Sequence, residues 1–286
     1  MVDKAFKEID DLYEKLGGKN KEALENAKLK PIHEEYLYSQ NGIIAMIAGM
    51  GSGKTYRCLK MASQQEVLFD EPFFETIDLC STSGEFDETT MTFREGIRFS
   101  NLITVKDSEL LSWLNEYTAK SFLHKTLSKF VNNGFKNPCE EMKKIIENNK
   151  LNTRVKLIEY ISKMLNYIGW NTNPHRLLLI LDDFASHPLL KKRDDPLSRM
   201  LKKLRHFNIT VIIIVQTVKS IPKDLKRNLS DLILFPGISE EDFLYLIRES
   251  SASCFPLREV WEEYRKIKED HIMFSLHIKA KEYKTY

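Results

Sequence analysis

A glycine-rich segment near residue 50 constrains the fold of this chain more than any other feature. A short apolar run of strand length, residues 43–48, leads into it, and a helical pattern at 55–64 follows. The segment matches the P-loop pattern Ala-x-x-x-x-Gly-Lys-Thr. Glycines let the backbone wrap closely around phosphates, and the helix start adds partial positive charge. The predicted phosphate-binding residues are Ala48, Gly49, Met50, Gly51, Ser52, Gly53, Lys54 and Thr55.

The last two P-loop residues carry separate expected roles. Lys54 is expected to bridge the β- and γ-phosphates of a nucleoside triphosphate, and the Thr55 hydroxyl to bind Mg²⁺. The sequence therefore predicts ATP and Mg²⁺ as the ligands of this loop.

A pair of acids follows the apolar run at residues 177–181. A P-loop enzyme needs a carboxylate at the end of a neighbouring buried strand to hold the Mg²⁺ shell, and Asp182 fits that place. Asp183 directly follows and is the candidate that activates the attacking water. Two adjacent carboxylates repel each other in a dry site, so a cation between them and the phosphates is expected.

Three further residues are candidates for the hydrolytic step. The β-branched run at 209–215 ends at Gln216, a polar side chain that can sense the γ-phosphate and position the water. Arg205 precedes this run and Arg227 follows it. Either arginine can stabilise transition-state charge from a neighbouring subunit. A surface or DNA-facing charge is the alternative for both.

Apolar strands alternate with helices along the rest of the chain. Further strands are expected at 73–80, 101–105, 231–235 and 272–278, and helices at 195–206, 239–248 and 257–266. This alternation predicts an α/β fold, a P-loop NTPase with a mostly parallel central sheet flanked by helices. The expected organisation is a helical extension at 1–40, an ATPase core at 41–237 with a helical insertion at about 107–173, and C-terminal helices with a last strand at 238–286.

Charge and cysteine usage narrow the function classes. The formal net charge is +2, yet residues 185–230 hold eleven Lys/Arg against three Asp, so the local balance is 11 − 3 = +8. Such a block fits phosphates, or alternatively a solvated helix face. The four cysteines lack the spacing of a disulfide framework or zinc site. Neither a signal peptide nor a run of membrane-span length is recognisable, so the chain is expected to be soluble and not secreted.

The ordered motif set resembles the poxvirus-type genome-packaging ATPases of the FtsK–HerA class of DNA-pumping motors. The resemblance covers roughly residues 42–250 and is densest at 177–250. The residues that carry it are Gly-Ser-Gly-Lys-Thr at 51–55, Asp182-Asp183, Arg205-His206-x-Asn208-x-Thr210, Gln216-Thr217, Pro222, Leu225, Arg227, Asn228, Ser239, Asp242 and Leu246.

This resemblance implies a specific activity. It implies an ATPase of the ASCE type that drives double-stranded DNA into a preformed capsid, works as a homo-oligomeric ring (pentamer or hexamer), contacts capsid vertex proteins, and acts in the host cytoplasm or viral factory, or with the virion. By position, Lys54 and Thr55 take the P-loop roles, Asp182 the Mg²⁺ role, Asp183 that of the catalytic acid and Gln216 that of the sensor; Arg205 and Arg227 match recurrent arginines.

The chain also departs from the class pattern. Ala48 stands where many members have glycine, and Asp183 stands where much of the class has glutamate, although the poxvirus-type proteins share aspartate. The helical stretch at 107–173 is longer than expected.

Three other functions remain compatible with the sequence to different degrees. A non-packaging DNA translocase or helicase shares the same motifs. An ATP-dependent assembly switch without processive hydrolysis would leave Asp183 structural, against which the two acids and Gln216 argue. A small-molecule kinase needs a lid and an acceptor site, and neither is recognisable.

Overall fold

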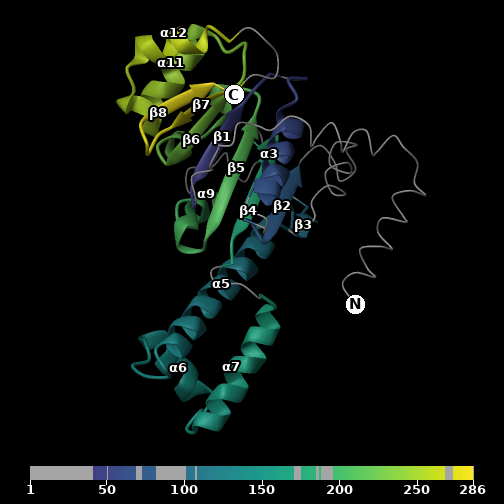
Figure 1. Cartoon of the computed structure of the whole chain (residues 1–286), viewed down its shortest axis with the longest axis vertical. Helices are drawn as coiled ribbons and strands as arrows, with labels where there is room; N and C mark the ends of the chain where they lie inside the picture. The colour runs from purple at the N-terminus through teal and green to yellow at the C-terminus, as the bar shows by residue number, and fades with distance from the viewer. Residues whose placement is uncertain are drawn as a thin grey trace, which may run out of the picture.

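A mixed eight-stranded sheet organises the molecule (Figure 1). The structure is a computed structural model that describes residues 41–49, 51–68, 73–81, 101–106, 108–170, 175–184, 187, 196–267 and 273–285. The extension predicted at residues 1–40 and the P-loop residue Met50 lie outside the described residues.

The sheet has the strand order β3-β2-β4-β5-β1-β6-β7-β8. The six strands β3, β2, β4, β5, β1 and β6 run parallel, whereas β7 pairs antiparallel with β6 and β8 pairs antiparallel with β7. The mostly parallel α/β fold predicted from the sequence is therefore confirmed. The strands are β1 (Ile43–Ile47), β2 (Thr76–Ser81), β3 (Asn101–Thr104), β4 (Leu177–Asp182), β5 (Ile209–Val215), β6 (Leu229–Leu234), β7 (Phe274–His277) and β8 (Glu282–Thr285).

The central strands end together. The P-loop strand β1 lies between β5 and β6, and β4 lies on the far side of β5. Ile47 is in register with Val215, and Asp182 with Ile214. Residues that follow β1, β4 and β5 therefore meet at one edge of the sheet, here called the carboxyl edge. The opposite edge, where these strands begin, is the amino edge.

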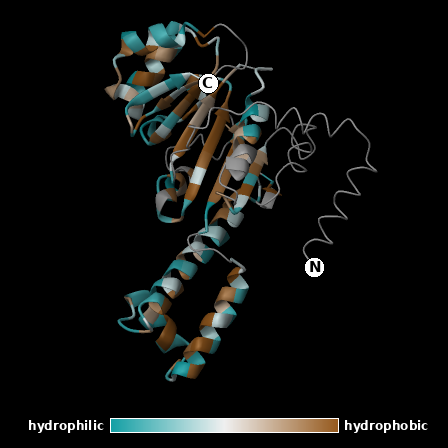
Figure 2. Ribbon diagram, viewed as in Figure 1, coloured by the Kyte–Doolittle hydropathy of each residue, from teal (hydrophilic) through white to brown (hydrophobic). Residues whose placement is uncertain are grey.

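Both faces of the sheet are covered, which is why its central strands are mostly apolar on both faces rather than alternating (Figure 2). Helix α3 packs on one face, where Leu59 joins Met46 and Ile180 in one buried cluster. On the other face, α5, α9, α11 and α12 contribute to the larger cluster. The helical segments outside the arm described next are α3 (Lys54–Leu68), α9 (Pro196–Leu201), η2 (Leu204–His206), η3 (Val218–Ser220), α10 (Lys223–Lys226), α11 (Glu240–Glu249), η4 (Ser251–Cys254) and α12 (Leu257–Tyr264).

Three helices between β3 and β4 form an arm that extends beyond the sheet (Figure 1). They are α5 (Leu110–Asn132), α6 (Glu140–Asn148) and α7 (Arg154–Ile168). The start of α5 packs on the sheet, and its middle reaches the amino edge, where Lys125 Nζ donates to the His206 carbonyl at 3.2 Å. Beyond that point the arm has a buried core of its own. None of the helices in the described ranges is long and apolar enough to span a membrane.

Three sequence predictions differ from the structure in detail. The helix expected at 195–206 is divided into α9 and η2. Strand β6 begins at Leu229 rather than 231, because Ser230 is polar but buried, and its hydroxyl donates to the Ile43 carbonyl at 3.0 Å. The last expected strand pairs with β8, which was missed because its side chains are mostly exposed and lack an apolar alternation.

One buried carboxyl in the sheet has no compensating contact within the described residues. Asp78 lies in β2, in register with Leu179 of β4, and is 0% exposed. Neither of its oxygens has a hydrogen-bond partner there. Burial raises the pKa of Asp78 from 3.8 to about 8. The folded chain therefore holds a proton at neutral pH that the unfolded chain has lost.

This proton linkage predicts how stability depends on pH. The unfavourable contribution of Asp78 is absent below the unfolded pKa, grows as pH rises from about 4 to about 8, and is complete above that window. Asp78→Asn removes this dependence, so the melting temperature of the variant relative to wild type should rise from pH 5 to pH 8. Thermal melts at both pH values measure it. Glu159→Gln, at an exposed position in the arm, is the control. Equal changes in melting temperature for Asp78→Asn and wild type between pH 5 and pH 8 would contradict a raised pKa of Asp78.

Candidate functional site

The P-loop connects the end of β1 to the start of α3. The sheet positions its first residue, because the Ala48 N–H donates to the Val215 carbonyl at 3.1 Å. Gly51 and Gly53 have φ values of 75° and 73°, in the left-handed region that side chains disfavour. The Ser52 hydroxyl donates to the Gly49 carbonyl at 2.8 Å and closes the turn. The glycine pattern is thus required by the backbone path of the loop.

Lys54 and Thr55 begin α3 and lie where its free N–H groups and dipole favour an anion. Lys54 is only 8% exposed, so its charge is held in the loop rather than in bulk solvent. A buried ammonium beside unpaired backbone donors is suited to a phosphate chain.

Asp182, the last residue of β4, contacts the P-loop directly. Thr55 Oγ1 donates to Asp182 Oδ2 at 2.8 Å, across a separation of 127 residues. Burial raises the pKa of Asp182, and the hydrogen bond from Thr55 opposes that rise. Within the described residues Asp182 Oδ1 is buried without a hydrogen-bond partner.

This arrangement fits a magnesium ion. Mg²⁺ prefers oxygen ligands and commonly takes only one or two from the protein, with the rest from phosphates and water. Thr55 keeps the lone pairs of its hydroxyl after donating to Asp182. The unpaired, buried Asp182 Oδ1 supplies the anionic oxygen that such a shell needs.

Asp183 and Gln216 meet at the same edge. Gln216 Nε2 donates to both carboxylate oxygens of Asp183, at 3.1 Å and 3.3 Å. The two residues are 33 positions apart and come together because β4 and β5 are neighbours that end side by side. Asp183 has φ 53°, a left-handed conformation that Asp and Asn tolerate better than most residues. This turn takes the chain out of β4 just beyond Asp182.

The two candidate arginines lie elsewhere. Arg205 belongs to η2, just before β5, and Arg227 follows α10, just before β6. Residues that precede parallel strands lie at the amino edge, so both backbones are at the edge opposite the P-loop. Arg227 is exposed. Within one chain the structure therefore brings neither arginine to the Thr55–Asp182 contact.

The basic block is partly neutralised in the fold. Three of its lysines form ion pairs: Lys202 with Asp224 at 3.2 Å, Lys219 with Asp242 at 3.3 Å, and Lys223 with Glu249 at 2.6 Å. Asp242 and Glu249 come from α11, outside the block, so a count along the sequence could not include them. Lys226 is 1% exposed, with its Nζ 4.4 Å from the centroid of the Tyr245 ring. The basic block at 185–230 therefore offers fewer free positive charges to a polyanion than its local balance of +8 implies.

Sequence reasoning missed the residues that support Gln216. Asp242 and Lys219 tie the turn after β5 to α11. The pattern Ser239-x-x-Asp242 is a helix-start signal that could have placed Asp242 in the first turn of a helix. No local signal identifies Lys219 as its partner.

Comparison with known proteins gives a family match. The model of the family described as "Poxvirus A32 protein" matches residues 108–254, which is half of the chain. The match includes the arm, β4, β5 and α11, so the arm falls within the region that the family model covers. Among curated protein sequences, none matches this chain.

Several solved structures are similar at low identity. The DNA-packaging ATPase B204 from Sulfolobus turreted icosahedral virus is 14% identical with a TM-score of 0.49, over 87% of this chain and 98% of that chain. B204 from Sulfolobus turreted icosahedral virus 2 in complex with ATP-γS is 14% identical with a TM-score of 0.47, over 86% and 96%. EssC (ATPases 2 and 3) from Geobacillus thermodenitrificans is 14% identical with a TM-score of 0.46, over 74% and 35%. These likenesses are too distant to transfer a substrate or a partner.

The Thr55–Asp182 contact predicts a metal-dependent difference between two substitutions. Thr55→Val keeps the shape but removes the hydroxyl, whereas Thr55→Ser keeps the hydroxyl. Thr55→Val should weaken binding of a slowly hydrolysed ATP analogue by about tenfold in Mg²⁺, the scale of one lost hydrogen bond, and by less in EDTA. Titration calorimetry of both variants measures the affinities. Equal Mg²⁺ dependence of the two variants would show that the hydroxyl is not a ligand.

Proposed function

The chain belongs to the poxvirus A32 protein family, and we propose that it is an ATP-hydrolysing motor that moves double-stranded DNA into a viral capsid. One observation carries the hydrolytic part of the proposal. The Thr55–Asp182 and Gln216–Asp183 contacts lie at the ends of β4 and its neighbours, beside the P-loop. A phosphate cradle, a metal-binding carboxylate and a second carboxylate are the parts that hydrolysis of a γ-phosphate needs.

Binding is the task of the P-loop. The N–H groups at the start of α3 and in the preceding glycine loop would face the β- and γ-phosphates, and Lys54 would neutralise them from its buried position. Because the loop is connected to β1 and α3, bound phosphates are fixed relative to the carboxyl edge. A nucleotide bound there would have its phosphates at the edge where the neighbouring strands β4 and β5 end.

Thr55 and Asp182 would hold the magnesium ion that accompanies ATP. Bound Mg²⁺ neutralises charge that develops on the phosphate oxygens. Asp182 fixes the Thr55 hydroxyl through their hydrogen bond and contributes its unpaired oxygen. Both residues belong to regular elements, α3 and β4, so their separation is set by the packing of the sheet.

Asp183 and Gln216 act on water. The Asp183 carboxylate accepts a proton from the water whose oxygen bonds to the γ-phosphorus, while the bond from that phosphorus to the bridging oxygen breaks and ADP leaves with that oxygen. The Gln216 amide holds that carboxylate through both oxygens and is placed to orient the water at the γ-phosphate. The left-handed backbone of Asp183 directs the chain away from the edge and leaves its carboxylate beside Gln216.

In an oligomeric ring, a neighbouring subunit can bring Arg205 or Arg227 to the P-loop. Arg205 and Arg227 precede strands at the amino edge, so stabilisation of transition-state charge by either requires a neighbouring subunit. Head-to-tail packing, with the amino edge of one subunit near the carboxyl edge of the next, generates a closed ring. A pentamer or a hexamer satisfies this geometry.

Duplex DNA is the proposed substrate of the motor. Lys203 is exposed and bears no ion pair among the described contacts, so it can meet the phosphate backbone. The family match supports action in infected cells. The proposed place of packaging is the host cytoplasm or viral factory, and the proposed partners are the vertex proteins of a preformed capsid.

Steady-state ATP hydrolysis with and without duplex DNA tests this function. Wild type should hydrolyse ATP, and duplex DNA should accelerate it. Asp183→Asn should fold normally, because Asn tolerates φ 53°, bind nucleotide, and lose about 10²- to 10⁴-fold in kcat, the range of general acid–base catalysis. Lys54→Ala should lose nucleotide binding as well.

The same assay separates the alternatives. Unchanged turnover in Lys54→Ala would remove the P-loop from the reaction. Nucleotide binding by wild type without hydrolysis, even with DNA, would favour an assembly switch. Strand displacement on a forked duplex would favour a helicase over a packaging motor.

A further inference from the structure

Gln216 is attached to two different parts of the fold. On one side it continues β5, whose last residue, Val215, is fixed by its hydrogen bond from the Ala48 N–H at 3.1 Å. On the other side it enters the turn of residues 217–220, which includes η3. Gln216 is exposed, so the direction of its side chain depends on how firmly this turn is held.

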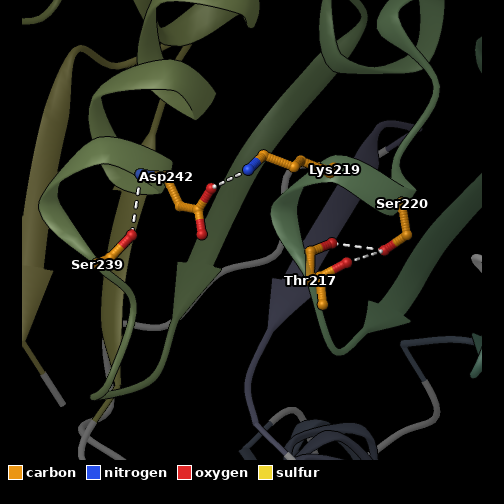
Figure 3. A network of polar contacts seen from close by, with 5 residues as sticks. All are labelled: Thr217, Lys219, Ser220, Ser239 and Asp242. Carbon is orange, nitrogen blue, oxygen red and sulfur yellow. Dashed lines mark hydrogen bonds and ion pairs between the residues drawn. The ribbon is translucent and has the colours of Figure 1, made fainter.

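The turn is internally bonded (Figure 3). The hydroxyls of Thr217 and Ser220 lie 3.0 Å apart, and the Ser220 hydroxyl donates to the Thr217 carbonyl at 2.5 Å. The Ser220 N–H also donates to that carbonyl, at 3.3 Å. Val218 points into the large core and is buried. The residues after Gln216 thus form one compact unit.

An ion pair joins this unit to α11. Lys219 Nζ lies 3.3 Å from Asp242 Oδ1. Asp242 is in the first turn of α11, where its N–H donates to the Ser239 hydroxyl at 3.2 Å, so its own backbone is fixed (Figure 3). The contact therefore connects a fixed point on α11 to the turn beside Gln216.

Helix α11 contacts the same segment at its other end. Glu249 pairs with Lys223 of α10 at 2.6 Å. The loop that leads from β6 into α11 is held by Tyr264, whose hydroxyl donates to the Phe235 carbonyl at 2.6 Å and accepts from the Ile238 N–H at 3.0 Å. Residues 217–226 thus lie along a helix that is anchored to β6 and α12.

We propose that Asp242, acting through Lys219, is a positioning residue that sets the orientation of Gln216 toward Asp183. The inference rests on the proposed function, since it assigns Gln216 a part in ATP hydrolysis. Gln216 Nε2 donates to both carboxylate oxygens of Asp183. A displacement of the turn therefore moves the carboxylate that receives the proton in the proposed reaction. Phosphate binding by the P-loop does not depend on this turn. Loss of this positioning is therefore expected to lower kcat and to leave KM for ATP unchanged.

The chain offers a matched control for this test. Asp242→Asn removes the ion pair but also one negative charge near the N-terminus of α11. Glu241→Gln removes the same charge from the same helical turn, and Glu241 is exposed and outside the Lys219 contact. Lys219→Met breaks the pair from the other side, and Lys219→Arg preserves its charge.

Two measurements on the full-length chain decide the proposal. Asp242→Asn and Lys219→Met should each lower kcat by about threefold, the scale that an exposed ion pair can supply, with KM for ATP unchanged. Lys219→Arg and Glu241→Gln should keep wild-type kcat. Without nucleotide, hydrogen exchange at the amides of residues 216–220 should be faster in Asp242→Asn than in wild type or Glu241→Gln.

Each contrary result has a separate meaning. Equal kcat in Asp242→Asn and Glu241→Gln, in a wild-type background that hydrolyses ATP, would overturn the positioning role alone. Equal hydrogen-exchange rates at residues 216–220 in Asp242→Asn and wild type would overturn the proposed route through the turn, regardless of the kcat values. Absence of turnover in wild type would overturn the proposed function itself.

Discussion

The alignment of three parallel strand ends is the constraint on which the rest of the structure depends. Strands β4, β5 and β1 are adjacent and in register, so their following residues converge at the carboxyl edge. A register shift of one residue would turn each side chain of a strand to the opposite face. The contact between Thr55 and Asp182, separated by 127 residues, exists only in this register.

Burial gives the acids at this edge different properties. Asp182 is almost enclosed, which raises its pKa and leaves one oxygen without a partner among the described residues. A cation is the group that stabilises such a carboxylate in its charged form. Asp183 is one residue further and less enclosed, and both of its carboxylate oxygens accept from the Gln216 amide. These different surroundings support the tasks proposed for the two acids, metal binding for Asp182 and proton transfer for Asp183.

Much of this arrangement could be predicted from the sequence, because the decisive signals are local. Apolar runs of strand length, the glycine loop and the acids after residue 181 indicate strands, a phosphate turn and a strand end without knowledge of the fold. The ion pairs of α11 could not be predicted, since Lys219 and Asp242 are linked only through tertiary packing. The buried Ser230 concealed the start of β6, because its hydrogen bond to the Ile43 carbonyl compensates for polarity that would otherwise exclude it from a core.

The edge positions of Arg205 and Arg227 make assembly the central requirement of this account, because the backbones of both candidate arginines lie at the edge opposite the P-loop of their own chain. The most direct measurement is the mass of the protein in solution with a slowly hydrolysed ATP analogue, Mg²⁺ and duplex DNA, by analytical ultracentrifugation or mass photometry. The account predicts a closed assembly of five or six subunits that depends on nucleotide. A monomer under all of these conditions would contradict it.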